Sequence, residues 1–269
     1  MSNQTIKIPK ERAQAIKQEL IKAGFRERAL PNALWSLTDG ENHVLFYSSG
    51  TLLLQGKESG RLKDLILSLL PSYERIMVGC DESGKGDVFG PLVLCCAVIK
   101  PEYYKKVLEL NYRDCKMMKD EEVLKKAKEF MAFGEFICKL VEPLELNKLY
   151  EQEGNLNRIL DGLYKNLLKG LREKYPKEEF YIDAYAKRNP FGRDVVFEHK
   201  GEENIAVAVA SVLARSKFLQ WLRERNLPKG SSIEALSLAK KVYQEDREKA
   251  KKLLKVFFLL TRPSGPPTI

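Results

Sequence analysis

Long apolar runs are missing from this chain of 269 residues. No stretch of about eighteen apolar residues occurs, which is the length that a helix crossing a bilayer needs. The first residues, Met1 to Lys7, also lack the apolar core of a secretory signal. We therefore expect a protein that does not enter a membrane and that is located in the cytoplasm.

Histidine and paired cysteine motifs are also scarce. The chain has two histidines, His43 and His199, and no Gly-x-Ser-x-Gly elbow, which disfavours a Ser-His-Asp hydrolase. Its five cysteines include no Cys-x-x-Cys pair, and Cys80, Cys95 and Cys96 lie within apolar, strand-like runs. We expect these cysteines to be reduced core residues rather than zinc ligands or disulfides.

The residues that are abundant indicate a basic globular protein. Hydrophobic residues make up 44% of the chain, enough for a sizeable core, and the length fits two domains. The formal net charge is +9, which favours a polyanionic partner such as nucleic acid.

Residues 1–70 predict a small α+β domain. Apolar side chains at helical spacing predict a helix over 9–24, and three apolar runs over 33–37, 43–47 and 50–55 predict a meander of strands. A second helical pattern ends at Pro71. Because this domain has no acid pair and no phosphate loop, we assign it substrate binding, with a structural cap as the alternative.

Residues 71–262 predict a larger α/β domain, followed by a loose tail over 263–269. Two or three strands come first, and strands then alternate with helices, which is typical of a mixed sheet flanked by helices. After the first two strands, the expected strands cover 135–141, 180–183 and 195–197, and the expected helices cover 120–131, 157–173, 202–221, 233–243 and 245–260.

The stretch 76–99 organises this second domain. It contains two apolar strands joined by a loop rich in carboxylates and glycines. Asp81 and Glu82 are adjacent, so they would point to opposite faces of a regular strand and can serve one site only if the strand ends there. The segment Ser83-Gly84-Lys85-Gly86 supplies that ending, and its glycines allow the backbone to approach a polar ligand closely.

Four acids stand where a strand ends or a helix begins: Asp81, Glu82, Asp183 and Glu202. Clustered carboxylates repel one another unless a cation neutralises them, so a set of four predicts Mg²⁺ or Mn²⁺. Asp183 alone could instead end a strand in a turn, and Glu202 alone could be a helix-initiating residue. Three further acids near the loop remain candidates by spacing: Asp87, Asp114 and Glu203.

Basic residues accompany these acids. His199 and Lys200 directly precede Glu202, where a lysine could contact a phosphate and a histidine could position one or transfer a proton. Lys85 is either a solvated turn residue or a backbone-phosphate contact.

The motifs together resemble the type 2 ribonuclease H family. Val78-Gly-Cys-Asp-Glu-Ser-Gly-Lys-Gly-Asp87, followed by Gly90-Pro91-Leu92-Val93, resembles the family's first motif, in which the acid pair binds metal and the glycine turn touches RNA. The other matching segments are Asp114-Cys115-Lys116, Asn155-Leu156-Asn157, Ile182-Asp183, His199-Lys200-Gly201-Glu202 and Ala208–Arg215.

Within this family the ribonuclease HIII branch is the more similar. Its members have an extra N-terminal domain that resembles half of a TATA-binding protein, and a glutamate in the last motif. Residues 1–70 and Glu202 fit both criteria. Three departures affect secondary contacts: Cys115 replaces a serine, Ala184-Tyr185 replaces Gln-Phe, and residues 255–261 lack an expected histidine and asparagine.

The resemblance implies a metal-dependent endoribonuclease with a ribonuclease H-like fold. It would hydrolyse the RNA strand of RNA/DNA hybrids and leave 5′-phosphate and 3′-hydroxyl ends, as a monomer. Alternatives are a type HII nuclease that cuts at single ribonucleotides, or a hybrid-binding protein without activity. The implied catalytic metal ligands are Asp81, Glu82, Asp183 and Glu202, and the implied substrate contacts are Ser83, Gly84, Lys85, Gly86, Lys116, His199 and Lys200.

The C-terminal region bears on which ribonucleotides are cut. Type HII enzymes that cut at a lone ribonucleotide carry a tyrosine in a Gly-Tyr-x-Thr-x-x-His context, and residues 233–261 contain no such context. Tyr243, the only tyrosine there, lies in a helical pattern. We therefore expect efficient cleavage within uniform hybrids and weak cleavage at a single ribonucleotide.

Overall fold

A computed structural model describes residues 2–8, 10–70, 74–112, 115, 118–198 and 204–260. The chain divides into two compact units: a first unit of Met1–Ile76 with Ile99–Arg113, and a second unit of Met77–Val98 with Asp114–Ile269. We expected the first domain to end at residue 70, whereas this unit extends to Ile76 and also takes up residues 99–113.

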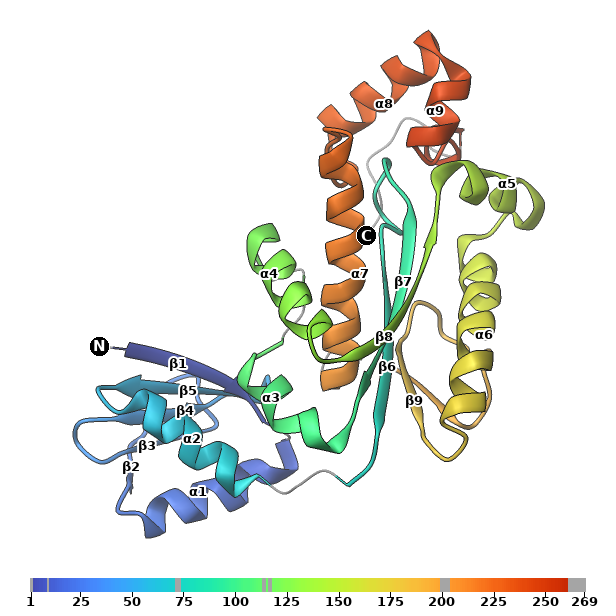
Figure 1. Ribbon diagram of the computed structural model, residues 1–269. Coiled ribbons are helices and arrows are strands. Elements are labelled where there is room, and N and C mark those ends of the chain that lie inside the picture. The colour runs from blue at the N-terminus through green and yellow to red at the C-terminus, as the bar shows by residue number, and fades with distance from the viewer. Residues whose placement is uncertain are drawn as a thin grey trace. The chain divides into compact units, whose positions relative to one another are not determined.

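The first unit is a five-stranded antiparallel sheet with helices (Figure 1). The strand order is β1-β5-β4-β3-β2, with β1 pairing with β5 along its whole length from Ser2 opposite Gly56 to Lys7 opposite Thr51. The strands are β1 (Ser2–Lys7), β2 (Arg26–Glu27), β3 (Trp35–Thr38), β4 (His43–Phe46) and β5 (Thr51–Gly56). The helices are η1 (Lys10–Arg12), α1 (Ala13–Lys22), α2 (Ser59–Leu69), η2 (Pro101–Tyr103) and α3 (Tyr104–Glu109).

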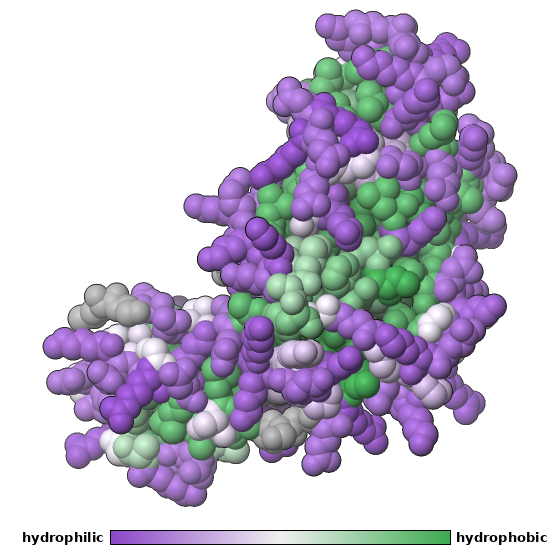
Figure 2. Space-filling model, viewed as in Figure 1, coloured by the Kyte–Doolittle hydropathy of each residue, from purple (hydrophilic) through white to green (hydrophobic). Residues whose placement is uncertain are grey.

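The core of the first unit follows from its sequence periods. Every second residue of β5 is buried, so Leu52 and Leu54 face inward, and α1 buries Ala13, Ile16 and Leu20 on one stripe. In Figure 2, hydrophilic residues cover most of the visible face of this unit.

The segment 99–113 belongs to this core although 22 residues of the second unit separate it from the rest (Met77–Val98). Tyr104, Val107 and Leu108 of α3 are buried, and the side-chain amide of Asn111 donates to the Thr5 hydroxyl at 2.7 Å. These contacts complete the first unit from a later part of the chain.

The second unit is built on a mixed sheet in the order β10-β9-β6-β7-β8. β6 runs parallel to β9, β9 runs parallel to β10, and β7 runs antiparallel to β8. The strands are β6 (Met77–Ser83), β7 (Leu92–Ile99), β8 (Glu135–Val141), β9 (Phe180–Asp183) and β10 (Val195–Glu198).

Helices cover both faces of this sheet, with α4 and α7 on one side and α6 on the other (Figure 1). Helix α7 lies close against β6 because Gly79 has no side chain: a Cβ there would be 2.2 Å from the Val207 backbone nitrogen. The helices are α4 (Asp120–Met131), α5 (Pro143–Glu153), α6 (Leu156–Lys174), α7 (Ile205–Glu224), α8 (Ile233–Glu245), α9 (Arg247–Leu253) and α10 (Phe257–Leu260).

Helix α7 is long and apolar enough to cross a membrane, which the search for apolar runs did not indicate. However, 78% of its apolar window is buried within the fold. Its apolar residues therefore serve as the central packing element of the second unit rather than facing lipid.

The cysteine prediction was wrong. Cys80 and Cys96 form a disulfide that joins β6 to β7, and Cys95 and Cys138 form a second one that joins β7 to β8. Cys95 and Cys138 are direct cross-strand partners with Cα atoms 4.1 Å apart, so the sheet register brings their sulfurs together. Cys115 takes part in neither disulfide.

The predicted fold class is confirmed, with differences in its elements. Strands β1 and β2 and helices α3 and α5 were not expected, and the single helix expected over 245–260 is split into α9 and α10. The helix expected to open at Glu202 begins at Ile205 in the described chain, with the Asn204 side chain as its cap. The tail over 263–269 lies outside the described residues.

Candidate active site

Two parallel strands bring three of the predicted acids to one sheet edge. Asp81 and Glu82 lie near the end of β6, and Asp183 ends β9. The register places Cys80 opposite Ile182, so Asp81 and Asp183, one residue further along each strand, come level at the carboxyl ends. Ligand sites in α/β sheets collect at this edge.

The environment of Asp81 favours its neutral form unless a cation is present. Burial raises the pKa of Asp81 well above its usual value, and the nearby charges of Glu82 and Asp183 raise it further. The Ser211 side chain and the Glu82 backbone N–H, which donates to Asp81 Oδ1 at 2.7 Å, oppose this shift. Glu82 and Asp183 are therefore close enough to Asp81 for their charges to act on it.

Lys85 stands beside this carboxylate group. Burial lowers the pKa of Lys85, while the charges of Glu82 and Asp183 act to raise it. Its Nζ lies 5.1 Å from the centroid of the Tyr185 ring. The ammonium group thus partly offsets the negative charge at the sheet edge.

The turn that carries Lys85 requires glycine at position 84. Gly84 has a φ of +91°, and a Cβ there would lie 2.2 Å from the Pro91 carbonyl oxygen. Its carbonyl accepts the Asp87 N–H at 3.3 Å and closes the turn. Gly86 has open space around it, which leaves its backbone accessible.

Tyr164 of α6 reaches the site from the opposite helix layer. Its hydroxyl donates to Glu82 Oε2 at 2.7 Å, and burial raises the pKa of Tyr164 well above its usual value, so the hydroxyl keeps its proton. The Tyr164 and Tyr185 rings stack at 5.8 Å, and the Tyr185 hydroxyl donates to Asp161 Oδ1 at 2.7 Å.

Sequence reasoning missed this tyrosine contact. Tyr164 lies on the leucine stripe of α6, four residues after Leu160, and is itself fully buried. A tyrosine on a buried stripe needs a partner for its hydroxyl, and this signal could have found the contact.

Asp87 has a structural role rather than a place among the ligands. It is buried, its Oδ1 accepts the Gly230 N–H at 2.5 Å, and Arg215 lies 4.0 Å from its Oδ2. The side chain therefore anchors the segment that follows the glycine turn.

Lys255 anchors the same segment from the C-terminal region. Its side chain is fully buried, and its Nζ donates to the carbonyls of Asp87, Phe89 and Gly90 at 2.9, 3.3 and 2.7 Å. Burial lowers the pKa of Lys255 to about 7, against the opposing charge of Asp87.

The remaining predicted site residues lie outside the described part of the chain. These are Glu202, His199, Lys200 and Lys116, together with the further candidates Asp114 and Glu203. Asn204, the first described residue after this gap, caps α7 by accepting the Ala206 N–H at 2.9 Å, and α7 packs on β6.

Within the described residues, no group of three or more His, Cys, Asp or Glu side chains has the spacing of a ready-made metal site. Asp81, Glu82 and Asp183 nevertheless fit a hard divalent cation chemically. They are oxygen donors whose mutual repulsion a cation would relieve.

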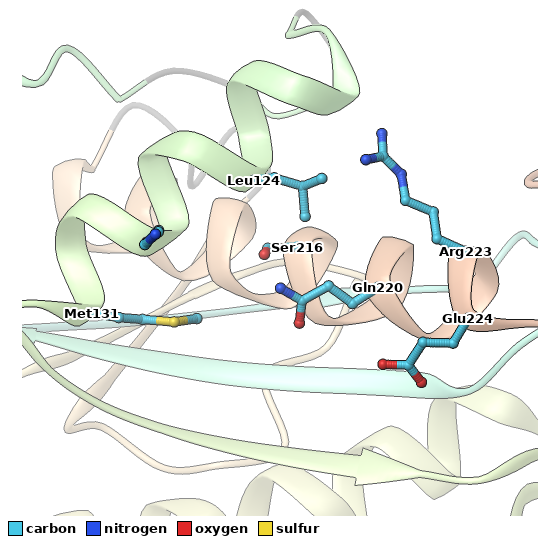
Figure 3. A pocket seen from close by; sticks show the side chains of 7 residues that line it. Leu124, Met131, Ser216, Gln220, Arg223 and Glu224 are labelled. Carbon is cyan, nitrogen blue, oxygen red and sulfur yellow. The ribbon is translucent and has the colours of Figure 1, made fainter.

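A separate pocket of about 430 Å³ lies between α4 and α7 (Figure 3). Leu124, Met131, Ser216, Gln220 and Arg223 are among the residues that line it. It contains none of the predicted ligands, so we treat it as distinct from the sheet edge.

Comparison with known proteins gives consistent matches. The family model for ribonuclease HII matches residues 78–255. A ribonuclease HIII from Aquifex aeolicus (strain VF5) is 41% identical over 249 residues, covering 90% of this chain and 96% of that protein.

Solved structures agree with these sequence matches. The crystal structure of Aquifex aeolicus RNase H3 superposes with a TM-score of 0.63 at 39% identity, covering 95% of this chain and 100% of that one. That of Bst-RNase HIII in complex with Mn²⁺ gives a TM-score of 0.66 at 23% identity, covering 96% of each chain, and bears on the fold alone.

Proposed function

Because this chain belongs to the ribonuclease HII family and matches a ribonuclease HIII over most of its length, we propose that the sheet edge at Asp81, Glu82 and Asp183 is the centre at which it cleaves RNA. The enzyme is a ribonuclease H that hydrolyses the RNA strand of RNA/DNA hybrids and leaves 5′-phosphate and 3′-hydroxyl ends. The observation that supports this centre is the level placement of Asp81 and Asp183 on parallel strands.

Asp81, Glu82, Asp183 and Glu202 would hold the divalent ions, Mg²⁺ or Mn²⁺. When bound, such ions activate water and stabilise the departing oxygen of a phosphodiester. Support comes from the donor set: burial, and then the charges of Glu82 and Asp183, raise the pKa of Asp81, and a cation bound by the three carboxylates would relieve this repulsion. The Mn²⁺ complex of the Bst enzyme is consistent with this choice.

The glycine turn would bind the RNA strand. A hybrid presents 2′-hydroxyls in a wide, shallow minor groove, and the exposed backbone of Gly86, in the turn that Gly84 shapes, can contact them without reading sequence. Lys85 would complete this contact, with the buried Ser83 supporting the turn from within. Lys116, His199 and Lys200 are proposed as further contacts.

The first unit, which exposes Arg26, Arg28 and Lys57, would hold the hybrid through phosphate contacts.

The enzyme would act as a cytoplasmic monomer outside any membrane. Disulfides are rare in cytosolic proteins, but the intracellular proteins of hyperthermophiles are an exception. The two disulfides are therefore compatible with this location in such an organism.

A cleavage assay on two substrates tests the function. We expect metal-dependent cuts throughout a uniform RNA/DNA hybrid and weak cleavage 5′ to a single ribonucleotide in duplex DNA. Tyr243, the tyrosine of the region that would sense a single ribonucleotide in type HII enzymes, lies on α8. The Arg247 guanidinium of α9 lies 5.5 Å from the centre of its ring, so Tyr243 contacts α9. Similar kcat/KM on both substrates would assign the protein to the single-ribonucleotide type, and no metal-dependent cleavage of either would leave a hybrid-binding protein.

A further inference from the structure

The hydroxyl of Tyr164 binds one of the proposed metal ligands directly. It donates to Glu82 Oε2 at 2.7 Å, and the tyrosine is fully buried. A hydrogen bond from a buried donor to a carboxylate is short and strong, and it selects one orientation of the acceptor.

The surrounding aromatic rings hold Tyr164 itself in place. Its ring stacks on Tyr185 at 5.8 Å with an interplanar angle of 9°, and it meets the edge of Phe191 at 5.9 Å. The ring of Tyr185 makes this contact, whereas its hydroxyl donates to Asp161 and does not touch Tyr164 or Glu82. The donor therefore has little freedom to move away from Glu82.

Glu82 has more need of such support than its neighbours. All three acids are half-buried, but a glutamate has one more rotatable side-chain bond than an aspartate, so the Glu82 carboxylate has more freedom to lose on binding an ion. Partners of this kind orient ligands in metal proteins, and replacing them typically costs about 10- to 100-fold in metal affinity or activity.

We propose that Tyr164 is a positioning residue, which holds the Glu82 carboxylate in the orientation that binds the divalent ion. This inference rests on the proposed metal centre. It concerns a residue of α6 that none of the matching sequence motifs includes.

Mn²⁺ binding to the full chain, measured by titration calorimetry without substrate, tests the proposal. Tyr164→Phe removes the hydroxyl and keeps the ring, so the dissociation constant for Mn²⁺ should rise about tenfold. The KM for the hybrid at saturating Mn²⁺ should stay within about twofold, because the glycine turn is unchanged.

Tyr185→Phe is the matched control. It removes the hydroxyl of the stacked ring, which binds Asp161 rather than Glu82, and should leave Mn²⁺ affinity within about twofold. Thermal denaturation of both variants verifies that they are folded. An unchanged Mn²⁺ affinity in Tyr164→Phe overturns the proposal, and an equal loss in both variants does so as well, because packing would then explain it.

A double-mutant cycle with Glu82→Gln provides a second measurement. If Tyr164 acts through Glu82, adding Tyr164→Phe to Glu82→Gln should weaken Mn²⁺ binding no further, and a further tenfold loss would refute the link. These titrations do not use cleavage. An unsubstituted chain that binds Mn²⁺ but cuts no hybrid would contradict the proposed function without affecting this result.

Discussion

Replacing Asp183 tests whether this strand-ending acid is a metal ligand or only ends a strand in a turn. If it is a metal ligand, Asp183→Asn should lower kcat/KM on a uniform hybrid at least about a thousandfold, which corresponds to about 4 kcal/mol of transition-state stabilisation. Without metal the variant should be as stable as the parent or more so, because the Asp183 charge repels Asp81. Near-parental turnover by a folded variant would remove Asp183 from the centre, and Glu173→Gln, an exposed acid on α6, serves as control.

Lys255 should give the protein a pH-dependent stability. Burial lowers its pKa to about 7, whereas a lysine in an unfolded chain titrates near about 10.4. Between these values the unfolded chain binds a proton that the folded chain does not, so stability should rise with pH. Relative to Lys255→Met, the parent should gain up to about 1.4 kcal/mol per pH unit above pH 7.

Urea unfolding of both proteins at pH 7, 8 and 9 measures this gain. If the difference in free energy of unfolding between parent and variant is the same at all three pH values, the three carbonyl acceptors keep Lys255 protonated in the folded protein.

Among single residues of the site, the sequence predicts the strand-ending acids but not the side chains that form hydrogen bonds beside them. Asp81, Glu82 and Asp183 follow apolar runs, and a strand end determines where such residues lie. Tyr164 contacts Glu82, which lies 82 positions earlier in the chain, and Lys255 contacts Gly90, which lies 165 positions earlier. No local sequence period encodes contacts over such separations.

Among the elements, β7 is held to both of its neighbours by disulfides. Removing the Cys95–Cys138 link, which spans 43 residues, should cost about 4 kcal/mol of stability by the loop-entropy estimate. We expect Cys95→Ala/Cys138→Ala to unfold at lower denaturant than the parent by that amount. Reductant should then destabilise the parent more than the variant.

Thiol titration of the unfolded, unreduced protein provides an independent check. Two disulfides leave one of the five cysteines, Cys115, to react. Five reactive thiols would contradict both disulfides and support the reduced cysteines that the sequence led us to expect.

Elements with a clear period were predictable, and those formed by pairing alone were not. β5 alternates and α6 carries a leucine stripe, so both could be read from the sequence. β1 begins Ser-Asn-Gln-Thr and has no apolar alternation, so its side chains do not predict a strand. It forms a strand because its backbone pairs with β5.

In the whole molecule, the first unit is the part that we propose holds the hybrid. Arg26, Arg28 and Lys57 are exposed on this unit, and replacing all three with Gln should raise the KM for a hybrid several-fold with little change in kcat. The slope of log KM against log salt should fall as phosphate contacts are lost. Replacing Lys240, Lys241 and Lys249 of the second unit with Gln is the control for net charge. Equal increases in KM from the two sets would exclude a specific role of the first unit in holding the hybrid.

The division into units also has a consequence for how the protein is made. A ribosome delivers the chain from its N-terminus, and domains generally fold as units during synthesis. The first unit needs Tyr104, Val107 and Leu108 to close its core, so it cannot finish folding when residue 76 emerges. When residues 104–108 emerge, β6 and β7 have already been made, but their outer partners β9 and β8 have not. The nascent protein must therefore keep the two central strands of its catalytic sheet, β6 and β7, without their outer partners while the first unit completes its own core.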